Sequence, residues 1–185
     1  MLIKLMPYAI ESLDLSQYDI VISSSSAFAH GVLTSSESLH ICYCHSPMRY
    51  AWDYTHKYLK DKKAGRLKSW LMRRAINKVR LWDKVASDRP DYYISNSQHV
   101  AARIEKFYRL PSQTIYPPVN IERLKPGKTG DYFVLLSTLT PYKKIDLAIS
   151  LFNKINKKLI VIGGGPEKDY LKSIAGPNTE IKGRL

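Results

Sequence analysis

The sequence predicts an α/β fold made of two Rossmann-like parts, each with a parallel sheet. Short apolar segments rich in β-branched residues alternate with segments of helical periodicity, which is the pattern of βαβ units. The strand centres within residues 132–183 are apolar, and this predicts a sheet covered on both faces there. Residues 115–130 concentrate prolines and glycines, so neither a helix nor a strand can persist there. We therefore expect domains at residues 1–124 and 125–185.

The first domain is expected to begin with a strand over IVISSSS, followed by a loop and a helix over AFAHGVL, and then a strand at 39–45. Apolar residues next recur at spacings of three and four, which predicts one amphipathic helix of about 20 residues. Its apolar stripe consists of Leu67, Trp70, Leu71, Ala75, Val79, Trp82 and Ala86. A strand at 91–97 and a helix from Gln98 to Tyr108, closed by Pro111, follow.

In the second domain, expected strands and helices alternate regularly. Strands are expected at 132–138, 158–165 and 179–183, and helices at 143–155 and 166–176. This order predicts consecutive βαβ units in one parallel sheet.

The composition is that of a folded chain with a large positive charge. Of the 185 residues, 44% are hydrophobic and 11% aromatic, which argues against disorder. The formal net charge is +13, and between residues 57 and 89 twelve basic residues stand against three acidic ones. This excess favours phosphate-bearing or otherwise anionic partners.

The sequence also excludes several classes of protein. Two cysteines are too few for a disulfide framework. No apolar run reaches the roughly 20 residues that span a bilayer, and residues 1–14 lack the long apolar segment and cleavage site of a secretion signal. We expect a cytoplasmic protein, soluble or peripheral on the inner face of the cell membrane.

Two segments of the second domain could meet a phosphate. Three glycines lead through Pro166 into a helix, whose unpaired N–H groups and dipole favour an anion, although a plain strand-to-helix turn is an equal alternative. Lys143 and Lys144 open the preceding helix, where cations are disfavoured. This placement indicates that they face an anion, and a solvated surface pair is the alternative.

His40, Cys42, Cys44 and His45 lie within six residues. Alternation along a strand places the first three on one face, but three ligands on one strand make a poor zinc tetrahedron, so we expect no metal site. His45 lies at the C-terminal end of the expected strand. Ligands bind at that edge of open α/β sheets, so His45 is the candidate functional residue.

The basic helix allows two kinds of anionic partner. Trp70 and Trp82 share its apolar stripe, so we expect them in a core or at a membrane interface rather than stacked on bases. The positive charge across residues 57–89 fits acidic lipid head groups. A nucleic-acid-binding module is an alternative that rests on charge alone.

Six sequence blocks resemble the glycosyltransferase family 4 enzymes of the GT-B fold, especially mannosyltransferases that use GDP-mannose to build lipopolysaccharide O-antigens. The blocks are YDIVISSSSAFAHGV, HICYCHSPMRYAWD, ISNSQHVAARIEKFY, YPPVN, LTPYKKIDLAI and IGGGPEKDYLK. They follow the family's order and cover essentially the whole chain. The resemblance implies a retaining, metal-independent transfer of mannose from GDP-mannose, or from another nucleotide sugar, to a lipid-linked or cell-surface glycan, with no cofactor.

The resemblance also implies roles for particular residues. Lys143 matches the lysine that clamps the donor diphosphate, and His45 matches the histidine near the transferred sugar, so these two are the expected catalytic residues. Arg49 and Tyr50 are expected on the acceptor side. Further expected donor contacts are Thr138, Lys144, Gly164, Gly165, Gly183 and Arg184. No protein nucleophile is required, because in this class the leaving phosphate is thought to assist deprotonation of the acceptor.

Three departures from the family pattern leave a second function open. Thr138 stands where the family usually has an arginine, which removes a bidentate phosphate contact. The family's paired glutamates would follow Leu185, and its opening strands and glycine-rich loop would precede Tyr18, so we expect both domains to be incomplete. The alternative is a truncated, inactive transferase remnant that binds a nucleotide sugar weakly or needs a complementary chain.

Overall fold

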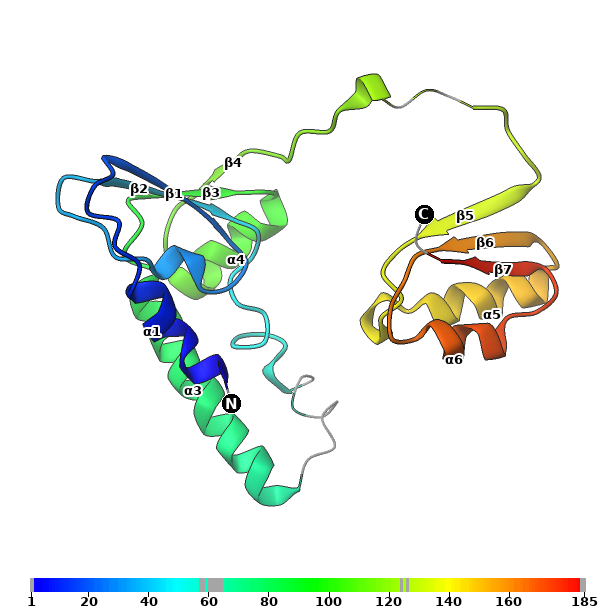
Figure 1. The fold of residues 1–185 in the computed structure, drawn as a ribbon, viewed down its shortest axis with the longest axis horizontal. Helices are drawn as coiled ribbons and strands as arrows, with labels where there is room; N and C mark the ends of the chain where they lie inside the picture. The colour runs from blue at the N-terminus through cyan, green and yellow to red at the C-terminus, as the bar shows by residue number, and fades with distance from the viewer. Residues whose placement is uncertain (1, 57–58, 60–64, 124, 126, 184–185) are drawn as a thin grey trace. The chain divides into compact units, whose positions relative to one another are not determined.

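The computed structural model describes residues 2–56, 59, 65–123, 125 and 127–183. The chain divides into two compact units, Met1–Val119 and Asn120–Leu185 (Figure 1). Each unit is an α/β structure with a parallel sheet, which confirms the predicted fold class. The domain boundary expected between residues 124 and 125 falls partly outside the described residues and stays a prediction.

The first unit contains a four-stranded parallel sheet in the order β1-β2-β3-β4. Its elements in chain order are η1 (Leu2–Lys4), α1 (Met6–Glu11), β1 (Ile20–Ser25), η2 (Ala29–Gly31), β2 (Leu39–Cys44), α3 (Arg66–Ala86), β3 (Tyr92–Ser95), α4 (Gln98–Tyr108) and β4 (Gln113–Thr114). The register pairs Ser25 with Cys44 and Cys44 with Ser95. The carboxyl ends of the first three strands therefore share one edge.

One face of this sheet packs against α4. Cys42, Cys44 and Tyr93 from the strands form a core with the helix residues Val100, Ile104 and Tyr108. On the opposite face Ile20 and Ile22 are 60% and 70% exposed. The helices among the described residues of this unit therefore pack on one face of the sheet alone.

Local sequence signals fix the ends of α4 where they were predicted. The Ser97 hydroxyl accepts a hydrogen bond from the Val100 N–H, which satisfies an otherwise unpaired donor of the first turn. The helix ends at Arg109, which adopts a left-handed conformation with φ 63°. The strands at this edge are shorter than expected, because their last residues turn into the loops.

The helix expected over residues 27–33 is wrong, since only the short turn η2 forms there. The His30 N–H bonds to the Ser25 hydroxyl, and the His30 side chain turns inward and is buried. Gly31 lies against the Trp82 ring, where an added Cβ would come within 2.5 Å of ring atoms. These tertiary contacts hold the segment in a tight turn.

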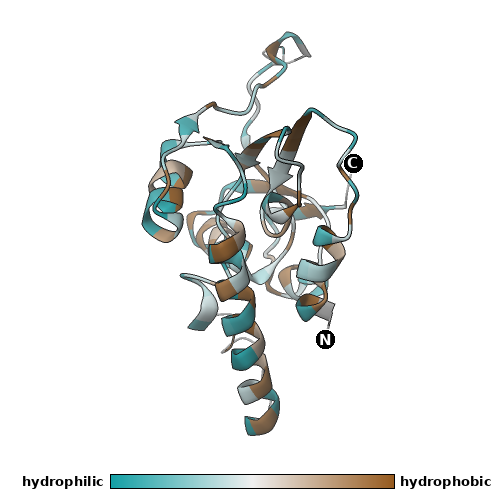
Figure 2. Ribbon diagram, turned by 90° about the vertical axis from the view of Figure 1, so that its left-hand side faces the viewer, coloured by the Kyte–Doolittle hydropathy of each residue, from teal (hydrophilic) through white to brown (hydrophobic). Residues whose placement is uncertain are grey.

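The predicted basic helix forms as α3, but its apolar stripe divides. Ala75, Val79 and Ala86 are buried, whereas Leu67, Trp70 and Leu71 are 72%, 51% and 41% exposed. Figure 2 shows apolar and polar residues alternating along this helix. Within the described part of the chain, no helix has both the length and the hydropathy to cross a bilayer.

The second unit contains a three-stranded parallel sheet in the order β5-β6-β7. Its elements are η3 (Ile121–Arg123), β5 (Tyr132–Leu136), η4 (Pro141–Lys143), α5 (Ile145–Ile155), β6 (Lys158–Ile162), α6 (Lys168–Ile174) and β7 (Thr179–Lys182). Both α5 and α6 lie on one face of the sheet (Figure 1). The core consists of Leu139, Ile145, Ile149, Leu159, Val161 and Leu171.

The other face of the second sheet is open among the described residues. Val134 and Leu136 of β5, which point to this face, are 55% and 77% exposed, whereas Phe133 points to the helix side and packs against Phe152 of α5 with ring centres 5.1 Å apart. The expectation that this sheet is covered on both faces is therefore wrong for the described residues, because α5 and α6 pack on one face alone.

Candidate functional site

A pocket of about 420 Å³ lies at the carboxyl edge of the first sheet. It is formed by the segment after β2 and the first turns of α4. The lining residues are His45, Ser46, Arg49, Asp53, Tyr54, His99, Val100 and Arg103. Because β2 and β3 are parallel neighbours, the segments that follow them meet at this edge. The structure thus brings His45 and Arg49, two of the expected site residues, into one pocket.

The position of His45 is fixed from several sides although its side chain is exposed. Its Nε2 atom lies 2.8 Å from the Ser24 hydroxyl, and its backbone N–H donates to the Ser25 carbonyl at 2.8 Å. The Tyr43 ring meets the imidazole edge to face, with ring centres 5.3 Å apart. The imidazole is therefore oriented by β1 and β2 while remaining open to a ligand.

Arg103 ties α4 to the segment after β2. Its guanidinium donates to both carboxylate oxygens of Asp53, to the Ser46 hydroxyl at 3.1 Å and to the Pro47 carbonyl at 3.3 Å. Burial disfavours the charged Asp53 carboxylate, but the hydrogen bonds and charge of Arg103 outweigh this and hold the pKa of Asp53 below its usual value. The bidentate pair gives the pocket a rigid wall.

The two residues expected on the acceptor side, Arg49 and Tyr50, lie in different surroundings. The Arg49 guanidinium lines the pocket and lies 4.0 Å from the centre of the Tyr54 ring. Tyr50 is half-buried and packs against the cluster of Met48, Ala51 and Val79. Tyr50 is therefore not among the lining residues, and its expected role stays a prediction.

Sequence reasoning missed four residues of this edge: Ser24, Asp53, His99 and Arg103. His99 and Arg103 are four residues apart in a helix that starts just after β3, so both lie on one helix face. That spacing was a usable signal, because the same edge was already expected to carry His45. The partner of Arg103, Asp53, depends on a tertiary contact 50 residues away that no local pattern indicates.

In the second unit, the loops after β5 and β6 are joined by backbone hydrogen bonds. Leu139 donates to the Gly164 carbonyl at 3.0 Å and accepts from Glu167 at 3.1 Å. Gly163 and Gly165 allow this close approach, because an added Cβ would lie 1.8 Å and 2.3 Å from carbonyl oxygens of the facing loop. The glycines therefore have a packing role, whereas a Cβ at Gly164 would meet open space.

The two candidate lysines lie at this same edge, with a different local structure from the one expected. Lys143 ends the 3-10 turn η4, and Lys144 adopts φ 54° as the N-cap of α5, which begins at Ile145. Both side chains are exposed, and Lys143 Nζ is 5.4 Å from the centre of the Tyr142 ring. The prediction that they open the α-helix is wrong because Pro141 first forms a separate turn.

The remaining expected donor contacts are placed as follows. Thr138 is exposed in the loop after β5. Gly183 follows β7, where an added Cβ would be 3.7 Å from Lys168 Nζ. Arg184 lies outside the described residues. The helix expected from Pro166 begins two residues later, at Lys168, because residues 163–167 are taken up by the loop.

A buried polar cluster lies beneath the first sheet's carboxyl edge. Asp83 accepts hydrogen bonds from Trp52 Nε1 at 2.7 Å and from the Tyr108 hydroxyl at 3.1 Å, and its other oxygen is 3.5 Å from His30 Nε2. Burial raises the pKa of Asp83 to about 6 and lowers the pKa of His30 to about 4. Because this cluster is closed to solvent, it belongs to the scaffold of the edge.

The cysteine and histidine side chains of β2 also have structural surroundings. His40 is buried with its Nε2 atom 2.9 Å from the Ser23 hydroxyl, and burial lowers its pKa. Cys42 and Cys44 are free thiols within the core. Across the described residues, no group of three or more His, Cys, Asp or Glu side chains could hold a metal ion.

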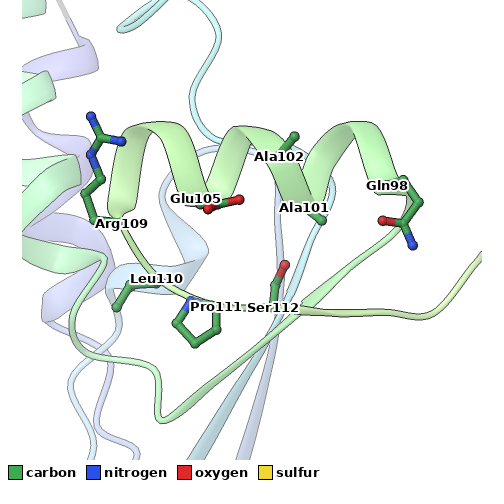
Figure 3. A pocket seen from close by; sticks show the side chains of 8 residues that line it. All are labelled: Gln98, Ala101, Ala102, Glu105, Arg109, Leu110, Pro111 and Ser112. Atoms are coloured by element: carbon green, nitrogen blue, oxygen red, sulfur yellow. The ribbon is translucent and has the colours of Figure 1, made fainter.

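A larger pocket of about 630 Å³ runs along another side of α4 (Figure 3). It is lined by Gln98, Ala101, Ala102, Glu105, Arg109, Leu110, Pro111 and Ser112. None of the expected site residues is among them. The smaller pocket combines two imidazoles with two guanidinium groups and is therefore the better candidate site.

Comparison with known proteins agrees with this architecture. The sequence profile of Glycosyltransferase Family 4 matches residues 1–123. The solved structure of TarM matches with a TM-score of 0.62 at 18% identity, and covers 99% of this chain but 36% of its own. A mutant of S. aureus TarM in complex with Fondaparinux, alpha-GlcNAc-glycerol and UDP matches with a TM-score of 0.60 at the same identity and coverage. The likeness shows a GT-B fold, and the chain spans about a third of the length of these structures. No curated protein matched.

Proposed function

The chain belongs to glycosyltransferase family 4, and from this membership we propose that it takes part in transferring a hexosyl group from a nucleotide sugar to a glycan acceptor. The observation that carries the proposal is the family match over residues 1–123, within which His45 lines a pocket at the sheet's carboxyl edge. More finely, we propose mannose from GDP-mannose as the donor and a lipid-linked or cell-surface glycan as the acceptor. The six blocks that resemble O-antigen mannosyltransferases support this choice.

The chemistry requires stabilisation of a leaving nucleoside diphosphate. Fixed cations and backbone N–H groups can stabilise that charge where water is excluded, so no cofactor or metal is part of the proposal. We assign the diphosphate clamp to Lys143, assisted by Lys144. Two features support this assignment: both amines are exposed, and both residues follow the carboxyl end of β5.

The acceptor side of the reaction is assigned to the first unit. His45 is proposed to contact the transferred sugar or the acceptor hydroxyl, with Ser24 holding the imidazole at 2.8 Å. Arg49, which lines the same pocket, is proposed to bind polar groups of the acceptor. The transfer is proposed to retain configuration at the sugar, and the leaving phosphate then accepts the acceptor's proton without a protein nucleophile.

The first test compares two neighbouring lysines. Calorimetric titration with GDP and GDP-mannose should show a loss of affinity for Lys143→Ala of about tenfold or more, corresponding to one charge-assisted phosphate contact of roughly 1.5–3 kcal/mol. Lys144→Ala is the matched control and should change affinity less. Equal losses for the two variants would contradict the clamp assignment.

A substitution at Thr138 tests the same site by an expected gain of affinity. It occupies the position where the family usually carries arginine, and its exposed site accepts a longer side chain without steric conflict. Thr138→Arg should raise affinity for the nucleotide. Titration with UDP and UDP-sugars runs in parallel, because a TarM structure contains UDP.

The alternative of an inactive remnant is favoured by Thr138 alone among the described residues. Incubation with radiolabelled GDP-mannose and a lipid-linked glycan separates the two functions. Transfer above the background of a His45→Ala variant supports the enzyme. Nucleotide binding without any transfer supports the remnant, and no binding of any nucleotide sugar would argue against both.

A further inference from the structure

The helix α3 has two faces with different surroundings. Its packed face carries Ala75, Val79, Asp83 and Ala86, all buried within the first unit. No residue between Arg66 and Arg74 is buried, and this half of the helix extends away from the sheet of its unit (Figure 1, Figure 2). The side of α3 that points away from the packed face is therefore available for contact.

The outer face of α3 is a continuous strip along one side of the helix. At 3.6 residues per turn, its members fall within an arc of about 100° around the helix axis. They are Leu67, Trp70, Leu71, Arg74, Lys78, Leu81 and Val85. The apolar side chains are 72% (Leu67), 51% (Trp70), 41% (Leu71), 69% (Leu81) and 67% (Val85) exposed. Five apolar side chains thus line one side of a 21-residue helix with two cations between them.

The charge of α3 is almost entirely positive at its surface. The helix contains seven lysines and arginines, and its one acidic residue, Asp83, is fully buried. Within the outer face, the Arg74 guanidinium lies 4.9 Å from the centre of the Trp70 ring. Cations whose aliphatic stems lie along apolar neighbours can keep their charged ends at the level of head groups while the neighbours insert.

We propose that the outer face of α3 docks onto the surface of an anionic phospholipid bilayer. A helix with an apolar face, flanking cations and no exposed acid binds at such a surface by burying its apolar side chains and by attraction to acidic head groups. A nucleic acid would use the cations but would leave the leucines and the valine exposed. The inference rests on α3 alone and is independent of the proposed sugar transfer.

Vesicle sedimentation tests the proposal with the full chain. We expect binding to vesicles of phosphatidylglycerol and phosphatidylcholine, much weaker binding to phosphatidylcholine alone, and a decrease with salt. Lys78→Gln should lower the partition coefficient about fivefold, as expected for one cation near an anionic surface. Leu81→Gln should lower it about tenfold, since it removes one inserted apolar side chain.

Matched controls come from α5 of the second unit, where Lys154 is exposed and Leu147 is 65% exposed. Lys154→Gln and Leu147→Gln should leave the partition coefficient unchanged. A second readout is quenching of tryptophan fluorescence by brominated lipid, which should fall most in Trp70→Gln because Trp52 and Trp82 are half-buried.

Four outcomes would overturn the proposal. These are no binding to anionic vesicles, equal losses for the α3 variants and their controls, a dimer in solution that Leu81→Gln dissociates, and binding to duplex or single-stranded nucleic acid without binding to vesicles. Because none of these assays uses a sugar donor, failure of the docking surface is distinguishable from failure of the transferase proposal.

Discussion

Replacing the buried Asp83 by asparagine gives a direct test of the polar cluster under the first sheet. The amide introduced by Asp83→Asn keeps an acceptor oxygen for Trp52 and Tyr108 but cannot ionise. In the natural protein burial raises the pKa of Asp83 from 3.8 to about 6, and it lowers the pKa of His30 from 6.5 to about 4. The two groups therefore affect stability with opposite signs as the pH falls.

The sign follows from which state binds the proton first. Folded Asp83 takes up its proton at a higher pH than in the unfolded chain, so acidification from pH 7 towards 4 favours the folded state. The raised pKa corresponds to a limit of about 3 kcal/mol, most of which is gained by pH 4. His30 has the opposite effect, because the unfolded chain binds its proton at a higher pH than the folded chain does; its limit is also about 3 kcal/mol.

The natural protein therefore has two offsetting contributions, and Asp83→Asn retains only that of His30. We expect the free energy of unfolding of the variant, relative to the natural protein, to fall by about 2–3 kcal/mol between pH 7 and pH 4. Urea titrations followed by tryptophan fluorescence measure it, since all three tryptophans belong to the first unit. Asp88→Asn, at a side chain 64% exposed beyond the same helix, is the control. A difference that stays constant within about 0.5 kcal/mol across this range would refute the reasoning.

Two further predictions concern the two sheet edges. Gly163→Ala should destabilise the second unit by more than about 1 kcal/mol, because the added Cβ would lie 1.8 Å from a carbonyl oxygen, whereas Gly164→Ala should not; thermal melting followed by circular dichroism compares them. Arg103→Gln should lower stability by about 1–3 kcal/mol and raise the pKa of Asp53, since it removes the hydrogen bonds and charge that lower that pKa. Carbon-13 NMR titration of the carboxyl measures the second effect, with Lys106→Gln as the control, and an unchanged Asp53 titration would contradict it.

Much of the fold follows from local signals that packing did not override. The order of strands and helices was predictable because apolar β-branched runs alternate with helical periodicity, and α4 was predictable to its last residue because Ser97 and Pro111 bracket it. The helix predicted over residues 27–33 does not form because the His30 N–H bonds to the Ser25 hydroxyl and Gly31 packs against Trp82, a tertiary contact that no local pattern indicates. The prediction of cover on both faces of the second sheet failed because an apolar strand indicates that burial is favourable without indicating which element covers it.

The candidate site was predictable only where a residue's role depends on its own strand. His45 could be placed because it follows β2, and ligands gather at the carboxyl ends of parallel strands. His99 and Arg103 join it only because β3 pairs beside β2, a neighbour relation that the sequence does not specify. The three glycines after β6 gave an ambiguous signal. They suggested phosphate binding, but Gly163 and Gly165 are also required by the close approach of two backbone segments.

The basic helix α3 shows why periodicity alone could not distinguish apolar residues that pack in the core from those that stay exposed. Steps of four along the chain connect Leu67 and Leu71 with Ala75 and Val79, so one continuous core stripe was a reasonable prediction. The packed residues, however, are those that meet other parts of the first unit, as Val79 does against Met48 and Ala51 and Asp83 does against Trp52 and Tyr108. Leu67 and Leu71, by contrast, stay exposed. Within the described part of the chain, apolar side chains of α3 that stay exposed and have no acidic neighbour on the same face need a different explanation from the core, and an anionic lipid surface satisfies both their hydropathy and the charge that surrounds them.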